Sequence, residues 1–400
     1  MLEDGKTYRL LSDGNTQNVF QFSSPGITRF IQDVQPECIE DLIAVNALYR
    51  PATRDIGATD DDVRFRRGEV APVYNYGCYE ATKNTFGIMV YQEQFMSVAH
   101  TLGGFDLGKT DLLRKAIGKK KADLMATLKA DFIAGAVGNG CPDYEAEEIW
   151  HKIEVAGKYS FNRSHAAAYA LTAYCGAWLK ANYPSAFYTV ALQWADDKEI
   201  PSLMAEMERC SPAKIVPPDI NRSGTEFFTD YATDEIFWSL TRIKQVGLRT
   251  VEYIVTERDR GGAYTGIENF IHRIFRYKLK KYSYWDDPDN AEEAVKVPVN
   301  ARHVKHMILA GCFDRIEKVG AVTERCALLE RAARELGFSL SEKDFPQDMR
   351  GRHFFWSQQQ IAVSGIGSID YRRIFDNSEA SGQVKGKASY LTLDEVARDE

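Results

Sequence analysis

The chain has 400 residues, a length that favours about two or three domains and a sizeable hydrophobic core. Its 44% hydrophobic and 27% charged residues are ordinary for a soluble globular protein, and its longest weakly polar run, residues 166–179, is too short and too rich in alanine for a membrane span. Seven cysteines without a CxxC pair, and an N-terminus without an apolar signal core, favour a reducing cytoplasm and offer no zinc or redox site.

The net charge of −7 does not by itself indicate nucleic-acid binding, which usually involves a basic domain. Two segments are nevertheless basic. Residues 109–121 carry six basic side chains against one acid, and residues 242–281 carry ten against four. This concentration is compatible with DNA contact on one face, and a solvated charged helix is the simpler alternative.

In chain order, apolar spacing predicts a helix over residues 37–49, which ends before Pro51. Residues 60–80 are charged and turn-rich, and residues 87–102 have the pattern of a strand running into a helix that ends at Gly103. Further helices are predicted over residues 111–117, 122–137, 143–155, 164–182, 185–194 and 200–210.

A strand-like connection is predicted over residues 215–220 and a hairpin over residues 227–240. After an acidic, turn-rich insertion at residues 282–297, helices follow over residues 302–309 and 324–336. The sequence contains no internal repeat. The predicted fold class is therefore mainly α with a few short strands.

Three segments carry candidate chemistry, and the first is the basic run of residues 112–121. Arg114 can hold phosphate oxygens through two parallel hydrogen bonds, and Lys115 can act as a point charge. A solvated basic turn is the alternative. The same run adds three consecutive lysines as candidate DNA contacts: Lys119, Lys120 and Lys121.

The second segment, residues 159–170, is a polar loop that enters an alanine-rich helix. Ser or Asn can cap this helix, and its first amides favour an anion, beside which Arg163 and His165 would lie. A capped core helix is the alternative. Ser164 and His165 are adjacent and are not surrounded by a GxSxG motif, so they do not indicate a hydrolase. The candidate binding residues of this loop are Asn162, Arg163, Ser164 and His165.

The third segment, residues 240–250, has the order of a helix-hairpin-helix motif, with an apolar–Gly–apolar hairpin between two helices. Gly247 is expected to allow the tight turn, and the exposed amides of the second helix can grip a DNA phosphate without reading sequence. Arg242, Lys244 and Arg249 add positive charge. The pattern is short, so a chance match remains an alternative.

Other candidates lack the companions that their chemistry needs. His303 and His306 have no carboxylate or cysteine at ligand spacing, which favours a pair on a surface helix over a metal site. The sequence has neither a P-loop nor a GxGxxG fingerprint.

Together these segments resemble the C family of DNA polymerases, the bacterial DNA polymerase III alpha subunits, in order along residues 5–316. Residues 19–26 look like the family's VFQLES-G, residues 41–51 like its EDLIA-ALYRPGP, and residues 90–96 like its YQEQVM. Residues 111–121 resemble its DLLRRAMGKKK and residues 161–170 its FNKSHAAAYA, while residues 217–221 and 299–314 are similar to its PPDIN and N-R-x-LIxSGAFD.

The resemblance implies a multi-helix fingers domain over residues 1–225, a helix-hairpin-helix DNA-binding region over 226–316 and the start of a clamp- and DNA-binding region over 317–400. It implies that Arg114 and Lys115 approach the triphosphate of the incoming nucleotide. Residues 162–165 would lie near the nascent base pair or the phosphates. The lesser candidates, which match basic positions of the family, are Arg50, Arg66 and Arg67.

The family's palm aspartates and its PHP domain precede the segment where this sequence begins, so no catalytic or metal-binding residue is expected here. Two-metal nucleotidyl transfer needs carboxylates that hold Mg²⁺. Two departures from the family pattern are Ala52-Thr53 in place of Gly-Pro and Lys115 in place of a second Arg, which loses the bidentate fork.

We therefore expect one piece of a replicative DNA-directed DNA polymerase, inactive alone, that contacts template–primer DNA and a dNTP while a palm-containing chain holds Mg²⁺. One alternative is a non-catalytic DNA-binding accessory protein that kept the fingers fold. Another is an incomplete reading frame whose palm lies in a longer chain. Gln347, Asp348 and Met349 lie where the family often places a sliding-clamp peptide, but no aromatic residue follows directly, which favours an ordinary loop.

Overall fold

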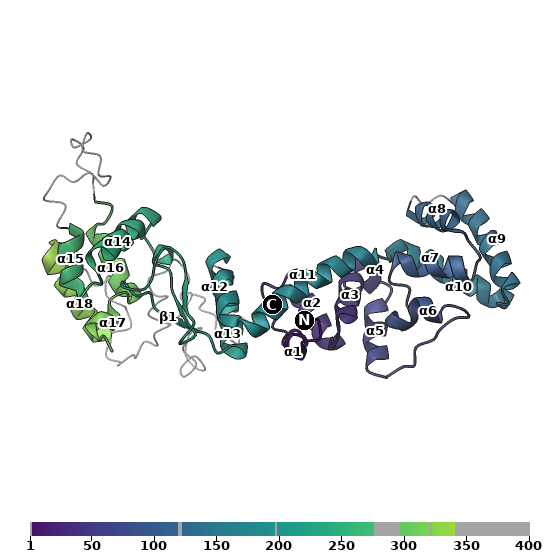
Figure 1. The fold of residues 1–400 in the computed structure, drawn as a ribbon, viewed down its shortest axis with the longest axis horizontal. Helices are drawn as coiled ribbons and strands as arrows, with labels where there is room; N and C mark the ends of the chain where they lie inside the picture. Colours follow the sequence, from purple (N-terminus) through teal and green to yellow (C-terminus); the bar gives the residue numbers. More distant parts are fainter. Residues whose placement is uncertain (1, 119–121, 197, 276–296, 321, 341–400) are drawn as a thin grey trace, which may run out of the picture. The chain divides into compact units, whose positions relative to one another are not determined.

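The computed structural model describes residues 2–118, 122–196, 198–275, 297–320 and 322–340. Over these residues the fold is mainly α-helical with a three-stranded sheet, as the sequence predicts. The chain divides into two compact units, Met1–Tyr183 and Pro184–Glu400, and each is described by itself (Figure 1). Several predicted features lie outside the described residues, namely Lys119, Lys120, Lys121, residues 282–296 of the acidic insertion and the segment Gln347, Asp348 and Met349.

The first unit is built from helices joined by short loops. In chain order these are α1 (Gly5–Ser12), α2 (Pro25–Val34), α3 (Ile39–Leu48), α4 (Pro51–Arg54), α5 (Ala58–Arg66), α6 (Tyr79–Thr82), the 3₁₀ turn η1 (Lys83–Thr85), α7 (Gln92–Thr101), α8 (Leu107–Gly118), α9 (Ala122–Gly138), α10 (Asp143–Tyr159) and α11 (Arg163–Asn182).

The long helix α11 packs against α1 and α3 (Figure 1). Ala166, Ala170, Ala173 and Ala177 follow helical spacing and are fully buried on the face that meets these helices. Their small side chains let the neighbouring backbones approach closely. The opposite face of α11 stays open, and the polar loop at its start is held by this core.

A second core in the same unit joins α7, α8, α9 and α10 around buried aromatic residues that include Phe132 and Trp150. Gly157, in the last turn of α10, is required by the close approach of α8, because a Cβ there would lie 2.4 Å from Ile117 Cγ2. The C-terminal ends of α8 and α10 therefore lie side by side.

The second unit combines helices with the small sheet. Its elements are α12 (Pro184–Trp194), α13 (Ile200–Cys210), β1 (Lys214–Val216), β2 (Phe228–Asp230), β3 (Glu235–Phe237), the 3₁₀ turn η2 (Leu240–Arg242), α14 (Leu248–Gly261), α15 (Ile267–Phe275), α16 (Ala301–Ala310), α17 (Asp314–Glu317) and α18 (Val322–Leu336).

The sheet has the order β1–β3–β2, with β1 parallel to β3 and β2 antiparallel to β3. The predicted hairpin is confirmed, with Thr229 opposite Ile236 and Asp234 at its turn in the left-handed region. A separate buried cluster joins α14, α15, α16 and α18. This cluster supports the helix-hairpin-helix segment.

Two local predictions were wrong. Before α7 the structure has an isolated bridge at Tyr91, whose partner is Phe161, rather than a strand. Residues 60–80 were predicted to be turn-rich, but their first part lies in helix α5. Acidic Asp60 and Asp61 lie in its first turn and Arg64 in its last, where each charge suits the helix dipole.

Candidate nucleotide and nucleic-acid interface

The loop before α11 is fixed by backbone pairing with the segment that precedes α7. The Phe161 amide donates to Val90 O at 2.9 Å, and the Gln92 amide donates to Phe161 O at 2.9 Å. The predicted binding loop therefore lies beside the first turn of α7, although 69 residues separate them in the sequence.

Arg50 holds the same loop from a third element. Its Nη2 donates to Tyr159 O at 2.5 Å and its Nε to Ala47 O at 2.8 Å. The guanidinium lies over the Phe161 ring, 4.4 Å from the centroid. Burial lowers the pKa of Arg50. Arg50 thus binds the protein's own carbonyls, which gives it a positioning role in this loop.

The first turn of α11 already binds a carboxylate of the protein itself. Asn162 caps the helix as predicted, because its side chain accepts from the His165 amide at 2.8 Å. Glu93 in α7 accepts from the Arg163 amide at 3.0 Å and from Asn162 Nδ2 at 2.9 Å. Among the described hydrogen bonds, none uses the Ser164 amide as a donor.

The side chains of residues 163–165 are exposed. Arg163 donates from Nη2 to both carboxylate oxygens of Glu40, at 2.7 and 2.8 Å, and this hydrogen bond raises the pKa of Arg163. The pair is about 40% exposed, so a ligand anion can compete with Glu40. His165 packs its ring 4.2 Å from that of Tyr169.

Arg114 and Lys115 lie on α8 and share one carboxylate. Asp111 Oδ1 accepts from Arg114 Nη2 at 2.8 Å, and its Oδ2 accepts from Lys115 Nζ at 2.6 Å. These hydrogen bonds, that of Lys115 first, lower the pKa of Asp111. Both cations are 41% to 57% exposed. Since α8 meets α10 at Ile117 and Gly157, they lie near the end of α10 that leads into the loop.

Arg66 and Arg67 differ from each other. Arg66 donates to Asp62 at 2.7 Å and to Asp41 at 2.6 Å and is 14% exposed, so it joins α5 to α3 inside the fold. Arg67 pairs with Asp33 at 2.7 Å on the surface. The geometry therefore favours a structural role for Arg66.

In the second unit, the turn of the hairpin before α14 is made by residues 243–246, where the Val246 amide donates to Ile243 O at 3.0 Å. Gly247 has φ −87° and ψ 167°, extended values that any residue adopts, whereas Gln245 has φ 69°. The prediction that Gly247 makes the turn was wrong, and Gln245 makes it. Gly247 instead leaves the N-cap of α14 without a side chain. Among the described hydrogen bonds, none uses the amides of Leu248 and Arg249.

The three cations of the hairpin have different surroundings. Arg242 is half-buried and donates from Nη2 to Gln193 O at 2.8 Å and to Ala195 O at 3.0 Å, so it binds the end of α12. Lys244 and Arg249 are exposed. Lys244 and Arg249 are therefore accessible to a ligand, whereas Arg242 is engaged in the fold.

A cluster of basic side chains on α16, Arg302 and Lys305, was not recognised from the sequence. Thr250 in α14 donates to Pro298 O at 2.7 Å, which brings the start of α16 beside the start of α14. Burial first, and then the positive charges of Lys305, Lys244 and Arg302, together lower the pKa of His306 to about 4. In the sequence, this cluster is visible as four basic or histidine side chains within Ala301–Ala310. That these side chains lie near Lys244 of the hairpin becomes clear only in the structure.

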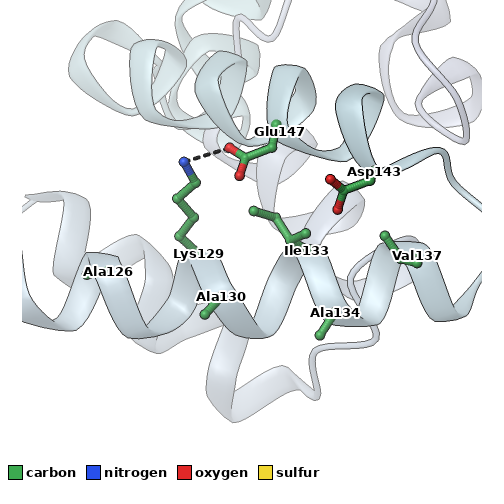
Figure 2. A pocket seen from close by; sticks show the side chains of 8 residues that line it. All are labelled: Ala126, Lys129, Ala130, Ile133, Ala134, Val137, Asp143 and Glu147. Atoms are coloured by element: carbon green, nitrogen blue, oxygen red, sulfur yellow. Dashed lines mark ion pairs between the residues drawn. The ribbon is translucent and has the colours of Figure 1, made fainter.

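The described residues hold one further hollow, of about 500 Å³, between α9 and α10 (Figure 2). Alanines of α9 line it, and Lys129 Nζ forms an ion pair with Glu147 Oε2 of α10 at 2.6 Å. No sequence-predicted site residue lines this hollow. Over the described residues, no group of three or more His, Cys, Asp or Glu side chains is placed to hold a metal ion, and no helix is long and apolar enough to cross a bilayer.

Comparison with known proteins gives two family matches. Residues 1–140 match the bacterial DNA polymerase III alpha subunit finger domain, and residues 213–286 match a helix-hairpin-helix motif. The first match includes Arg50 and Glu93, which hold the loop before α11, and the second includes the hairpin before α14.

Individual relatives agree with these matches. The chain is 39% identical to DNA polymerase III subunit alpha of Aquifex aeolicus over 70% of this chain and 24% of that protein, and 38% identical to that of Borreliella burgdorferi over 79% and 26%. It is 37% identical to that of Thermus aquaticus over 78% and 24%. The chain thus spans about a quarter of the length of these relatives. It belongs to the bacterial DNA polymerase III alpha subunit family and contains the finger and helix-hairpin-helix segments of that family.

Proposed function

We propose that this chain supplies the incoming-nucleotide and template–primer contacts of a replicative DNA-directed DNA polymerase that works in the cytoplasm. The proposed fingers domain spans residues 1–225, followed by the helix-hairpin-helix region at 226–316 and the start of the C-terminal region at 317–400. The main support is the loop before α11, where Arg50, Glu93 and Asn162 fix an exposed run of polar side chains beside the end of α10.

The nucleotide contacts would come from two places in the first unit. Arg114 and Lys115 are half-exposed, and their only described partner, Asp111, is on the same helix, so both can reach a triphosphate. The Ser164 amide, which has no acceptor among the described hydrogen bonds, offers a donor to a phosphate, and the exposed His165 ring would lie near the nascent base pair. Arg50 and Arg66 would act by positioning, since both bind groups of the protein.

The template–primer contacts would come from the second unit. The amides of Leu248 and Arg249 face outward from a bare N-cap, which suits a phosphate oxygen. Lys244 and Arg249 add charge beside them, and Arg302 and Lys305 extend it along α16. Such contacts hold the duplex without reading its sequence.

As the family resemblance implies, the Mg²⁺ ligands are proposed to be palm carboxylates that this chain does not supply. They would be supplied by a further part of a longer polypeptide or by a separate palm-containing chain, and this chain by itself would not join nucleotides. A sliding-clamp contact through Gln347, Asp348 and Met349 remains a prediction from the sequence.

The test is primer extension. The chain is mixed with, or expressed together with, the palm segment encoded in the same genome, and Mg²⁺-dependent extension is measured on a primed template. We expect extension from the mixture and none from this chain alone. No extension by any such mixture, with both proteins folded and with DNA binding by this chain retained, would favour the non-catalytic accessory protein.

A further inference from the structure

Five side chains form a continuous row along the open face of the first unit. Tyr169 lies one helical turn after His165 on α11, and their ring centroids are 4.2 Å apart. The His165 ring continues to Phe161 at 5.2 Å, and the Tyr169 ring continues to Phe20 at 5.1 Å. Arg50 ends the row above Phe161. We call these four rings the aromatic row.

Of the rings in this row, Phe161 packs against the hydrophobic core of the first unit, and the others lie outside that cluster of described residues. Phe20 is 44% exposed and His165 is exposed, while Phe161 and Tyr169 are half-buried. The two apolar neighbours of Phe20, Val19 and Phe22, are both fully buried. The chain therefore turns one large aromatic ring outward from a segment that otherwise enters the core.

The turn that carries Phe20 is fixed at an energetic cost. Asn18 and Gln21 have φ of 56° and 63°, in the left-handed region, which asparagine tolerates and glutamine adopts at a cost. Lys180 of α11, which is 1% exposed, donates to Gln17 O at 2.7 Å. A buried lysine on a loop carbonyl and two left-handed residues together hold Phe20 against Tyr169, which indicates a surface shaped in advance for a ligand.

A row of neighbouring, mutually tilted rings beside a cation suits nucleobases, whose faces stack on aromatic side chains and on guanidinium groups. One free nucleotide would cover a single ring, whereas the row presents three, those of Phe20, Tyr169 and His165, besides the Phe161 ring that Arg50 covers. The row also leads to Asn162 and Arg163, whose exposed polar groups suit a sugar–phosphate backbone. The length and the chemistry therefore fit consecutive unpaired bases better than an apolar protein segment.

We propose that Phe20, Tyr169 and His165 form a stacking surface for the unpaired bases of single-stranded DNA, namely the template strand ahead of the primer end. The proposal rests on the proposed function for the identity of the nucleic acid. It assigns a role to the VFQF segment and to Tyr169, which the nucleotide contacts do not use.

The test compares two oligonucleotides of equal length and charge, oligo(dT) and an abasic oligonucleotide, by fluorescence anisotropy with the full chain. We expect tighter binding of oligo(dT), and a loss of about 5- to 100-fold for Phe20→Ala and for Tyr169→Ala. Binding of the abasic oligonucleotide should change less than twofold. Tyr169→Phe keeps the ring and should bind oligo(dT) like the wild type.

Two controls separate stacking from other effects. Tyr231→Ala removes a 72% exposed ring from the second unit and should leave the oligo(dT) affinity unchanged. Photocrosslinking of an oligonucleotide that carries 5-iododeoxyuridine should label the peptides of Phe20 or Tyr169.

Three results would overturn the assignment. They are equal wild-type affinity for oligo(dT) and the abasic oligonucleotide, unchanged oligo(dT) affinity in folded Phe20→Ala and Tyr169→Ala proteins, and competition by free dTTP as strong per molecule as that by oligo(dT). The last result would make the row a mononucleotide site. Because these assays need no catalysis, base-dependent binding that persists without primer extension would separate this proposal from the proposed function.

Discussion

The Glu93 carboxylate accepts a hydrogen bond from the Arg163 amide at 3.0 Å, so the N-terminus of α11 is neutralised by a side chain of α7. The same carboxylate accepts from Asn162 Nδ2 at 2.9 Å. This contact gives the loop its geometry and also places a negative charge where a ligand phosphate would bind. A nucleotide must therefore approach through the remaining donors or displace Glu93.

Glu93→Gln should tighten triphosphate binding. The glutamine oxygen can still accept from the Arg163 amide, while the negative charge is removed, which is worth about 0.3–1 kcal/mol at a helix N-terminus, or roughly two- to fivefold in affinity. Isothermal titration calorimetry with a dNTP measures the change. Glu147→Gln, on α10, is the matched control and should have no effect. A weaker affinity in Glu93→Gln would show that the charge itself holds the site together.

Asp111→Asn should also strengthen polyphosphate binding, by about two- to fivefold, because Arg114 and Lys115 would lose the carboxylate that they share. The gain should disappear when Arg114→Ala and Lys115→Ala are added, and this background is the control. A gain that persists without the two cations would mean that Asp111 repels the ligand from elsewhere on the surface.

The sequence indicated the polar loop and the cap of α11 correctly, because Asn162 acts within three residues of its own position. It did not reveal Glu93, because that contact depends on how α7 and α11 pack. For the same reason, Arg50, Arg66 and Arg242 appeared as free cations in the sequence, whereas each binds groups from distant elements in the structure. Charge and spacing predict which residues are cationic, and packing decides which remain available.

The helix-hairpin-helix segment should separate into DNA-binding and structural residues. Lys244→Ala and Arg249→Ala should each lower duplex affinity and reduce the slope of log Kd against log salt by about one. Arg242→Ala should leave that slope unchanged and lower the free energy of unfolding by about 1–3 kcal/mol, because it removes hydrogen bonds to Gln193 and Ala195. A salt slope reduced equally in Arg242→Ala would contradict this division.

His306 should make the second unit less stable in mild acid. The folded pKa is about 4, against 6.5 for the free side chain, so the unfolded chain takes up a proton first as the pH falls. The stability that His306 contributes is therefore complete above about pH 6.5 and is lost between about pH 6.5 and 4. In His306→Gln, the fall in unfolding free energy over that window should shrink by about 1–2 kcal/mol, a value reduced because the side chain is partly exposed.

Urea unfolding at several pH values measures this effect. His272→Gln, an exposed histidine on α15, is the control and should keep the wild-type pH dependence. An unchanged pH dependence in His306→Gln would contradict the assignment of the titration to this side chain.

In the proposed function, this chain positions a nucleotide and a DNA end for chemistry performed by palm carboxylates that it does not supply. The most direct measurement is steady-state primer extension, with the palm segment present, for the wild type and for the Arg114→Ala, Lys115→Ala double variant. We predict that the KM for dNTP rises at least tenfold while the Kd for primed DNA changes less than threefold, because the proposed function has the two cations contact the triphosphate. Equal losses of nucleotide and DNA affinity would contradict the claim and make α8 part of a DNA-binding accessory surface.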